Sequence, residues 1–375
     1  MAQITSPHPT KAKISLPAFR HNLGVVRSCV GNDVKIMAVV KSNAYGHGMR
    51  TIAFEAARNG AAYLGVARVD EGTLLRRDGV KHPILVFEVP IVEQIERALI
   101  DDLDLTIANR ESADAVSSIA GKIKRRAKVH LKIDSGMGRL GFPFASAASD
   151  AAKIASLSNL EVVGIYSHLA TSDEEDLTYA RVQTERFADL IHQLEKQGVE
   201  IPLKHLANSG GIIALPESYF TMVRPGIMLY GYAPRNGMAS SPPLQPVMSL
   251  VSRVSFMKTV AAQTSISYNR RYFTKTRTNV ATVPIGYGDG YSRSLTNRGE
   301  VLIKGKRYPT VGTVCMDHIM IDVGDDDVAV GDEVILIGAN GSQSLTAWDM
   351  AEKIGTIPYE ITCNISIRVQ RAFTS

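Results

Sequence analysis

The sequence has few of the features that indicate a secreted or membrane-spanning protein. Only three of its 375 residues are cysteines, Cys29, Cys315 and Cys363, and none forms a CxxC pair. An odd number of scattered cysteines does not imply a disulfide framework and fits a reducing compartment. No run of 18 apolar residues occurs, and the first residues lack the apolar stretch of a signal peptide. We therefore expect a cytoplasmic protein without a membrane partner.

Aromatic and basic residues are too sparse to predict a nucleic-acid partner. The net charge is +5, and only 6% of the residues are aromatic. The densest basic stretch, Lys122–Lys128, stands alone, whereas a nucleic-acid footprint needs a clustered basic face with stacking aromatics. We interpret this stretch as a solvated helix face. The 45% hydrophobic and 21% charged residues match an ordinary globular protein and exclude a disordered chain.

The first two-thirds of the chain alternate short apolar runs with helical patterns. The helical patterns include His47–Ala57, Val92–Ala98, Arg110–Ile119 and Leu177–Lys196. Eight strands alternating with helices predict a parallel (β/α)8 barrel of the TIM type, with the active site at the carboxyl ends of the strands. An open, doubly wound sheet is the alternative, but no GxGxxG follows the first strand. The eight expected strands are Lys35–Lys41, Tyr63–Arg68, Ile84–Val89, Leu103–Ala108, Lys128–Asp134, Val162–His168, Leu203–Asn208 and Val223–Tyr230.

The last third of the chain has a different pattern. A proline-containing linker, Ala233–Pro246, precedes strand-like runs with Gly-Asp turns and only one clear helix, Leu345–Lys353. We expect residues 1–240 to form the barrel and residues 241–375 to form a mostly β domain, with the first residues, up to about residue 12, pairing with that second domain. The expected strands of this domain are Met248–Met257, Asn279–Pro284, Glu300–Ile303, His318–Val323 and Glu333–Ile337.

Lys41 lies at the end of the first expected strand, after four apolar residues. A lysine at the tip of a buried strand is either an edge residue that extends its amine to solvent, or an amine that forms a Schiff base. Burial favours the second interpretation, because it disfavours the charged form of the amine.

The string AVVKSNAYGHG around Lys41 resembles the cofactor-lysine motif of the alanine racemase family. The resemblance extends from about residue 12 to Arg371, and it recurs at the expected strand ends. Further matching motifs are LKIDSGMGRLGF (131–142), GIYSHLATSDE (164–174), HLANSGG (205–211), VRPGIMLYG (223–231), MSLVSRV (248–254), SYNRRY (267–272), GYGDGYSR (286–293), VGTVCMDHIMIDV (311–323) and IPYEITCNISIRVQR (357–371).

The resemblance implies interconversion of L- and D-alanine, supplying D-alanine for peptidoglycan. Removing a proton from the α-carbon requires an electron sink, which pyridoxal 5′-phosphate provides. In this family the cofactor forms a Schiff base with a lysine, here Lys41, and inversion uses two bases on opposite faces of the substrate, here Lys41 and Tyr268. The family's tyrosine enters the site from the partner subunit, so a homodimer with interfacial active sites is implied.

The resemblance also assigns the remaining site residues, and none of them binds a metal. Arg224 would face the pyridine nitrogen, and His168 would bridge Arg224 toward Tyr268. Arg139 would bind the substrate carboxylate and the cofactor's phenolic oxygen, because its planar guanidinium can form paired hydrogen bonds. The backbone of Met316 would contact the same carboxylate, with Asp317 shaping its loop. The implied phosphate ligands are Tyr45, Ser209, Gly226, Ile227 and Tyr359.

Lys132 matches a lysine that many family members carry carbamylated, and the modified side chain would orient Arg139. Its alternative is an inward-pointing barrel lysine paired with Asp134 or Glu161. Without the resemblance, Tyr268 would be an ordinary strand tyrosine, His168 a core histidine and Gly226 a turn residue. The chain departs from the usual family pattern at three positions, Ser135, Asn269 and Gly288.

Three alternative functions remain open at this point. A non-enzymatic pyridoxal-phosphate carrier has a similar barrel but lacks a second domain. A decarboxylase of the same fold would need a late catalytic cysteine, whereas Cys315 and Cys363 lie within racemase motifs. A racemase of different or broader specificity, for serine or lysine, is the nearest alternative, since a pocket discriminates by only about 1–3 kcal/mol per methylene.

Overall fold

The computed structural model describes residues 7–238 and 241–375 and divides the chain into two compact units. One unit, here called the barrel unit, comprises Phe19–Ala44 and Met49–Gln245. The other, here called the β unit, comprises the described residues up to Ala18, together with Tyr45–Gly48 and Pro246–Ser375. The expected domain boundary after residue 240 lies at residues 239–240, outside the described residues. The last change of unit falls between Gln245 and Pro246.

The barrel unit is a closed ring of eight parallel strands, as predicted. Ring closure is shown by two pairings: β5 pairs with β6, and β10 pairs with β2. Apolar residues fill the strands, and the core includes Met37, Leu85 and Tyr166. The eight strands are β2 (Lys35–Val39), β3 (Tyr63–Val66), β4 (Ile84–Val86), β5 (Asp104–Ile107), β6 (Ala127–Asp134), β8 (Leu160–Tyr166), β9 (Leu203–His205) and β10 (Met222–Val223).

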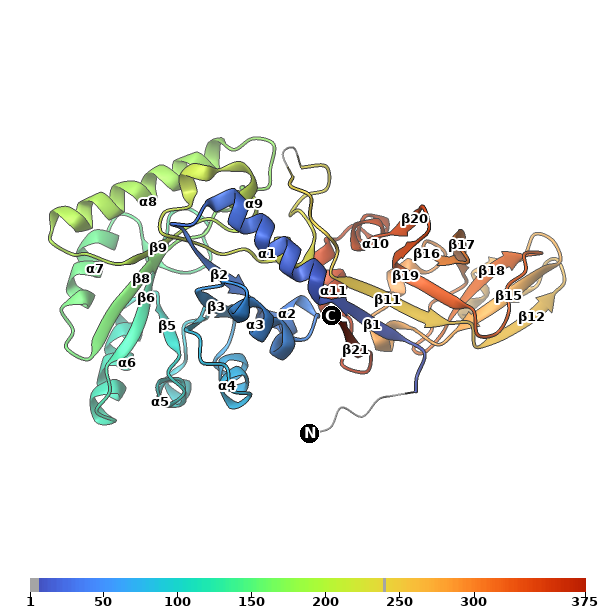
Figure 1. Ribbon diagram of the computed structural model, residues 1–375, viewed down its shortest axis with the longest axis horizontal. Coiled ribbons are helices and arrows are strands. Elements are labelled where there is room, and N and C mark those ends of the chain that lie inside the picture. The colour runs from blue at the N-terminus through green and yellow to red at the C-terminus, as the bar shows by residue number, and fades with distance from the viewer. Residues whose placement is uncertain (1–6, 239–240) are drawn as a thin grey trace. The chain divides into compact units, whose positions relative to one another are not determined.

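Helices surround the barrel strands, and in Figure 1 α4, α5 and α6 lie outside β3–β6. Each helix buries one apolar face; α3, for example, buries Ile52, Ala53 and Ala56. Asn109 caps α6 by accepting the Ser112 N–H. The helices are α1 (Leu16–Val30), α3 (Met49–Arg58), α4 (Val69–Arg77), α5 (Val92–Ile100), α6 (Arg110–Lys122), α7 (Ala147–Ala155), α8 (Thr178–Lys196) and α9 (Ser209–Ala214), and the short β7 (Phe142–Pro143) extends β6. No helix in the described part of the chain is long and apolar enough to cross a membrane.

Two local predictions in the barrel unit were wrong. The last expected strand, Val223–Tyr230, is extended only at Met222–Val223, because Pro225 and Gly226 interrupt it and Ile227–Tyr230 form a 3₁₀ helix, η2. The basic stretch Lys122–Lys128 is not a helix face. Instead, α6 ends at Lys122, a turn follows, and β6 begins at Ala127.

The β unit contains a ten-stranded sheet that joins both ends of the chain. Strand β1 (Lys11–Ser15) pairs antiparallel with β11 (Met248–Arg253) and parallel with β21 (Gln370–Thr374). The mostly β architecture is therefore confirmed. The other strands are β12 (Phe256–Val260), β15 (Thr278–Val283), β16 (Glu300–Ile303), β17 (Lys306–Val311), β18 (Ile319–Gly324), β19 (Glu333–Asn340) and β20 (Gln343–Leu345), and β13 (Ser265–Ile266) pairs separately with β14 (Tyr272–Phe273).

Two α-helices accompany this sheet in the described part of the unit, whereas the sequence predicted one. Helix α10 (Ala347–Ile354) is capped by Thr346, and Gly355 ends it in the left-handed region. The additional helix, α11 (Pro358–Cys363), begins with a proline at its first turn. Its six residues are too few for a clear helical periodicity in the sequence, which explains why it was missed.

Candidate active site

Lys41 lies directly beyond β2, where the backbone turns left-handed. The strand ends at Val39, two residues earlier than predicted, and Lys41 begins a short turn labelled α2 (Lys41–Tyr45). Ser42, Asn43 and Ala44 have φ angles of 52–54°. Each non-glycine residue in this region costs about 1–2 kcal/mol, so the surrounding contacts must hold the turn in place.

Glu71 supplies one of those contacts. Its carboxylate is buried at 9% exposure and accepts the Ser42 N–H at 2.7 Å. The other carboxylate oxygen accepts the N–H groups of Ala67 at 2.8 Å and Arg68 at 3.3 Å. One buried carboxylate therefore ties the turn after Lys41 to the loop after β3. Glu71 was not predicted as a site residue from the sequence.

Arg224 is buried at 4% exposure, just beyond β10. Its Nη1 donates to the carbonyl of His205 at 2.8 Å and to the Nδ1 of the same residue at 2.9 Å. Its Nη2 donates to the carbonyls of Ser167 at 2.6 Å and Leu206 at 3.0 Å, and lies 3.2 Å from His168 Nδ1. Among the described residues no carboxylate pairs with Arg224, and no hydrogen bond uses its Nε. A single N–H therefore remains for a ligand.

Two positively charged neighbours and burial define the protonation state of His168. Burial, followed by the charges of Arg224 and Arg139, holds the pKa of His168 well below its usual 6.5, so the ring is neutral at neutral pH. Since an arginine can only donate, Nδ1 of His168 is the acceptor of this longer contact, in which it shares an Nη2 N–H with a neighbouring carbonyl, and Nε2 carries the ring proton. For Arg224 itself, burial lowers the pKa to about 10, so the guanidinium stays charged.

Lys132 projects from β6 into the barrel and is only 2% exposed. Its Nζ donates to the carbonyl of Ile133 at 2.7 Å and lies 5.6 Å from the centre of the Tyr166 ring. Burial, then the charge of Arg224, lowers the pKa of Lys132 to about 7. Within the described residues it forms no ion pair, so the alternative pairing with Asp134 or Glu161 is not seen.

Arg139 lies in the loop after β6. The loop is held by Asp134, whose carboxylate accepts the N–H groups of Gly136 at 3.0 Å and Gly138 at 3.1 Å. Arg139 is exposed, and no hydrogen bond or ion pair of the described residues engages its guanidinium. The loop thus holds the Arg139 guanidinium near the mouth of the barrel, where its paired N–H groups can bind a carboxylate.

Ser209, at the start of α9, is buried and close to the turn that contains Gly226. Its hydroxyl oxygen accepts the N–H of Gly226 at 3.0 Å and that of Met228 at 3.4 Å. Because the oxygen accepts both bonds, the hydroxyl proton is free to be donated elsewhere. The structure thus brings Ser209, Gly226 and Ile227 together at the carboxyl ends of β9 and β10.

In the β unit, Tyr45 and Tyr359 lie next to each other. Their ring centres are 5.9 Å apart, with an interplanar angle of 46°. Burial, then the neighbouring Cys363, raises the pKa of Tyr45, so its phenol stays protonated and can donate. Gly46 follows with φ at +84°, and a Cβ there would lie 2.0 Å from the Thr362 carbonyl, so only glycine fits against α11.

Tyr268 and Met316 occupy adjoining loops of the β unit and are 69% and 52% exposed. The Ser267 hydroxyl donates to the Thr313 carbonyl at 2.6 Å, and the Thr313 hydroxyl donates to the Tyr268 carbonyl at 2.8 Å. Asn269 adopts φ at +61°, a left-handed conformation that asparagine tolerates better than most residues. The asparagine is therefore compatible with this turn.

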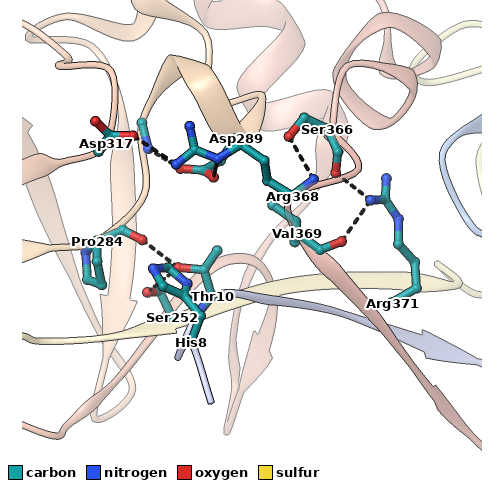
Figure 2. A network of polar contacts seen from close by, with 11 residues as sticks. His8, Thr10, Ser252, Pro284, Asp289, Asp317, Ser366, Arg368, Val369 and Arg371 are labelled. Carbon is teal, nitrogen blue, oxygen red and sulfur yellow. Dashed lines mark hydrogen bonds and ion pairs between the residues drawn. The ribbon is translucent and has the colours of Figure 1, made fainter. Parts of the chain in front are cut away.

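Arg368 lies between Asp317, the neighbour of Met316 in sequence, and Asp289, as Figure 2 shows. Its guanidinium donates to Asp317 at 2.8 Å and pairs with the buried Asp289 at 3.3 Å. The Gly288 N–H donates to the Met316 carbonyl at 2.9 Å. A Cβ on Gly288 would lie 2.7 Å from Arg368 Nη1, so glycine at this position leaves room for the arginine.

The expected site residues therefore form two groups, one in each unit. The barrel unit gathers Arg224 with His168, Ser209 with Gly226 and Ile227, and Lys132, and it carries Lys41 and Arg139 at its loops. The β unit pairs Tyr45 with Tyr359, and Tyr268 with the Met316 loop. Sequence reasoning missed the polar residues Asp104, His130 and His205. Alternation offered a signal for His130, which lies two residues before Lys132 on one strand and so faces the same side.

Comparisons with known proteins match both parts of the chain. A family model described as alanine racemase, N-terminal domain, matches residues 14–234, and one described as alanine racemase, C-terminal domain, matches residues 247–373. The chain is 44% identical over 367 residues to alanine racemase 2 of Caldanaerobacter subterraneus subsp. tengcongensis, covering 97% of this chain and 95% of that protein. It is 42% identical to alanine racemase of Methanococcus maripaludis, over 98% and 99% of the two chains.

Solved structures show the same similarity. Alanine racemase of Clostridium difficile 630 superposes with a TM-score of 0.94 at 38% identity, over 99% of this chain and 97% of that chain. Alanine racemase from Bacillus anthracis with bound L-Ala-P gives 0.94 at 37% identity, over 99% and 96%. Histidine racemase from Leuconostoc mesenteroides gives 0.91 at 30% identity, over 99% of each chain.

Proposed function

The chain belongs to the alanine racemase family, and we propose that it interconverts L- and D-alanine by moving the α-proton between two bases, Lys41 and Tyr268, with pyridoxal 5′-phosphate as cofactor. The full-length relatives support alanine racemase as the activity. The match of residues 247–373 to the family's C-terminal domain argues against a pyridoxal-phosphate carrier, which would consist of the barrel alone. The same match argues against a decarboxylase.

The environment of Arg224 carries the proposal. Both Nη atoms are used by protein acceptors, so the buried cation offers one N–H from Nε. One N–H suits a single acceptor atom, such as a pyridine nitrogen, and not the two oxygens of a carboxylate. Arginine cannot give up its proton at neutral pH, so it donates to such a nitrogen without protonating it. The residues around Arg224 therefore fit the proposed cofactor.

The anion-binding residues fit the cofactor's phosphate as well. The Ser209 hydroxyl keeps its proton for an acceptor beyond Gly226 and Met228. Tyr45 and Tyr359 provide two phenols, and the pKa of Tyr45 is raised by burial. We propose that these groups, with the N–H groups of Gly226 and Ile227, hold the phosphate, while Lys41 forms the covalent link to the cofactor.

Proton transfer is proposed to involve the two faces of the substrate. Pyridoxal phosphate, when bound, supplies the electron sink that lets the α-proton leave. Lys41 would take or return that proton on one face, and Tyr268 would do so on the other. His168 is neutral and has its proton on Nε2, so it can donate toward the phenolate oxygen of Tyr268 while accepting from Arg224.

The substrate carboxylate is assigned to Arg139 and to the backbone N–H of Met316. Lys132 would orient Arg139 after carbamylation. A pKa of about 7 leaves much of the Lys132 amine neutral at neutral pH. The neutral nitrogen can attack carbon dioxide, forming an N–C bond and releasing one proton, which converts the side chain to an anion. An anion beside Arg139 and Arg224 would gain favourable charge interactions.

A homodimer is part of the proposal. Tyr268 and Met316 are largely exposed in a single chain, which suits groups that complete the active site of a partner chain. We assign the attachment of the cofactor at Lys41 and its contact with Arg224 to the barrel unit, and the second base, with the phosphate ligands Tyr45 and Tyr359, to the β unit. A cytoplasmic location and a supply of D-alanine for peptidoglycan complete this proposal.

The substrate requires a direct test, because a histidine racemase shares the fold at 30% identity, and serine and lysine remain alternative substrates. Initial racemisation rates of the L-forms of alanine, serine, lysine and histidine should be measured with the cofactor-loaded protein. Alanine should give the highest kcat/KM. A higher value for any of the other three would contradict the assigned substrate.

The attachment residue is tested separately by borohydride reduction and peptide mapping. We expect the pyridoxyl mass on the peptide that contains Lys41. Lys132 is the natural internal comparison, since its pKa of about 7 also makes it a reactive amine. A pyridoxyl mass on Lys132 would overturn the assignment of Lys41.

A further inference from the structure

A row of buried side chains connects Arg224 to the opposite end of the barrel. His205 Nε2 lies 3.0 Å from His130 Nδ1, and both side chains are completely buried. His130 Nε2 lies 3.4 Å from a carboxylate oxygen of Asp104, which is 2% exposed and is the first residue of β5. The Tyr63 hydroxyl donates to the same carboxylate at 3.0 Å. The row therefore begins at the amino end of one strand and ends at the catalytic face.

The hydrogen-bond donors in this row can be assigned from its two ends. Arg224 can only donate, so the Nδ1 of His205 is an acceptor and its Nε2 carries the proton. That N–H must then donate to the Nδ1 of His130, which places the His130 proton on Nε2, toward Asp104. Asp104 lies at the far end as an electrostatic contact, 3.4 Å from this Nε2, which forms no hydrogen bond within the described residues. The N–H groups of the row are thus all directed one way, from arginine toward aspartate.

The row also joins two buried opposite charges. Arg224 has no carboxylate partner among the described residues, and the other buried acid of the barrel unit, Glu71, is occupied by backbone N–H groups. A buried cation without a counter-charge is costly, and hydrogen bonds in series polarise one another. Burial, then the charge of Arg224, holds the pKa of His205 well below 6.5, so this ring is neutral.

Neighbouring groups hold the rings in place. The Tyr166 ring stacks on His205 at 4.8 Å with an interplanar angle of 5°, and its hydroxyl shares a hydrogen bond of 2.8 Å with Thr106. Tyr63 packs edge-on against His130 at 5.8 Å. These contacts restrict rotation of the two ring planes.

We propose that Asp104 is a positioning residue, which acts through His130 and His205 to orient Arg224 toward the bound cofactor. By fixing the Nε2–H tautomer of both rings, it keeps His205 Nδ1 as an acceptor and so keeps both Nη atoms of Arg224 occupied. Nε is then the N–H that faces the ligand. This inference rests on the proposed function for what Arg224 contacts, whereas the tautomers can be measured without any activity.

The test uses Asp104→Asn, which removes the charge and retains an oxygen for the Tyr63 hydroxyl. Tyr63→Phe is the matched control, since it removes the other hydrogen bond to the same carboxylate. In the unaltered protein, ¹⁵N NMR of the histidine rings should show protonated Nε2 and unprotonated Nδ1 for His130 and His205. Asp104→Asn should produce a second tautomer at His130, and kcat should fall about tenfold while KM changes less than twofold. Tyr63→Phe should change neither the tautomers nor kcat by more than about twofold.

A second pair of variants keeps the test decisive if Asp104→Asn does not fold. His130→Asn can place an amide oxygen where Nδ1 was, so it should keep His205 in the Nε2–H form, whereas His130→Leu should not. We expect His130→Asn to retain more kcat than His130→Leu. Protonated Nδ1 at His205 in the unaltered protein, or unchanged tautomers and kcat in Asp104→Asn, would overturn the proposal. If alanine is not the substrate, the tautomers predicted for His130 and His205 are unaffected, and only the predicted change in kcat fails.

Discussion

The polar residues of the barrel unit and those of the β unit differ sharply in their surroundings. In the barrel, Arg224 and Lys132 are nearly inaccessible to solvent, and burial lowers the pKa of each. In the β unit, Tyr268 and Met316 are mostly exposed, and hydrogen bonds from neighbouring loops hold their backbone carbonyls. Burial in the barrel therefore changes the pKa values of its site residues. In the β unit, the site residues lie on loops whose backbone is held by hydrogen bonds. Substitutions should affect the two units in different ways.

Lys41→Ala should have the largest effect, because it removes the covalent link to the cofactor and one of the two bases. Racemisation should fall by at least about 10³-fold in both directions, within the range expected for general acid–base and covalent catalysis. Steady-state rates measured from each enantiomer check this. Lys35→Ala, an exposed lysine on the same strand, is the control. Residual activity above a hundredth of the original would place the essential amine elsewhere.

Arg139→Lys should mainly weaken substrate binding. A lysine keeps the charge but not the paired N–H groups, and charged hydrogen bonds are worth about 1.5–3 kcal/mol, so KM should rise about tenfold to a hundredfold. Arg110→Lys, on an exposed helix face beside Asp114, should leave KM unchanged. An unchanged KM in Arg139→Lys would remove this residue from the carboxylate site.

Lys132→Met tests how burial in the barrel affects stability. The unfolded chain, with a lysine pKa near 10.5, binds more protons than the folded chain, with a pKa of about 7. The free energy of unfolding should therefore rise with pH between these values, by at most about 1.4 kcal/mol per unit from this group. Urea unfolding in carbon-dioxide-free buffer should show this slope, and Lys132→Met should lack it. Equal slopes in the two proteins would contradict the lowered pKa.

Gly288→Ala should give the smallest effect, because it acts on an exposed ion pair. The new methyl group would displace Arg368 and weaken its contact with Asp317, which braces the loop of Met316. Exposed pairs contribute about 0.2–1 kcal/mol, so KM should rise about twofold. Gly24→Ala, where nothing lies within 4 Å, is the matched control. A reduced kcat with unchanged KM would show that this brace does not serve substrate binding.

The fold could be predicted from the sequence because its strands and helices follow two different periodicities. The eight barrel strands were all found, since each is a short apolar run before an amphipathic helix. The end of the last strand was misplaced because Val223–Tyr230 is mostly apolar apart from Arg224, so hydrophobicity could not separate the two-residue β10 from η2. The first residues were expected to pair with the second domain, and β1 does so, but its partner β21 lies more than 350 positions away and could not be identified from local patterns.

The candidate site was predicted mainly through residues that carry recognisable motifs. Lys41 and Arg139 lie in such strings, and their roles remain predictions. The left-handed turn after Lys41 could not be read from Ser42, Asn43 and Ala44, because two of these three residue types rarely adopt it. The orientation of Arg224 depends on two side chains, His205 on β9 and His168 just beyond β8, and this arrangement exists only in the folded chain.

The claim that Lys41 and Tyr268 serve opposite faces is tested most directly by Tyr268→Phe in deuterium oxide. Deuterium incorporation at the α-carbon should be followed from L-alanine and from D-alanine by NMR. We predict that exchange from L-alanine falls by about 10²–10⁴-fold, whereas D-alanine still exchanges its α-proton without inversion, because Lys41 can remove and return a proton on its own face. Equal loss of exchange from both enantiomers would contradict this division between the two residues.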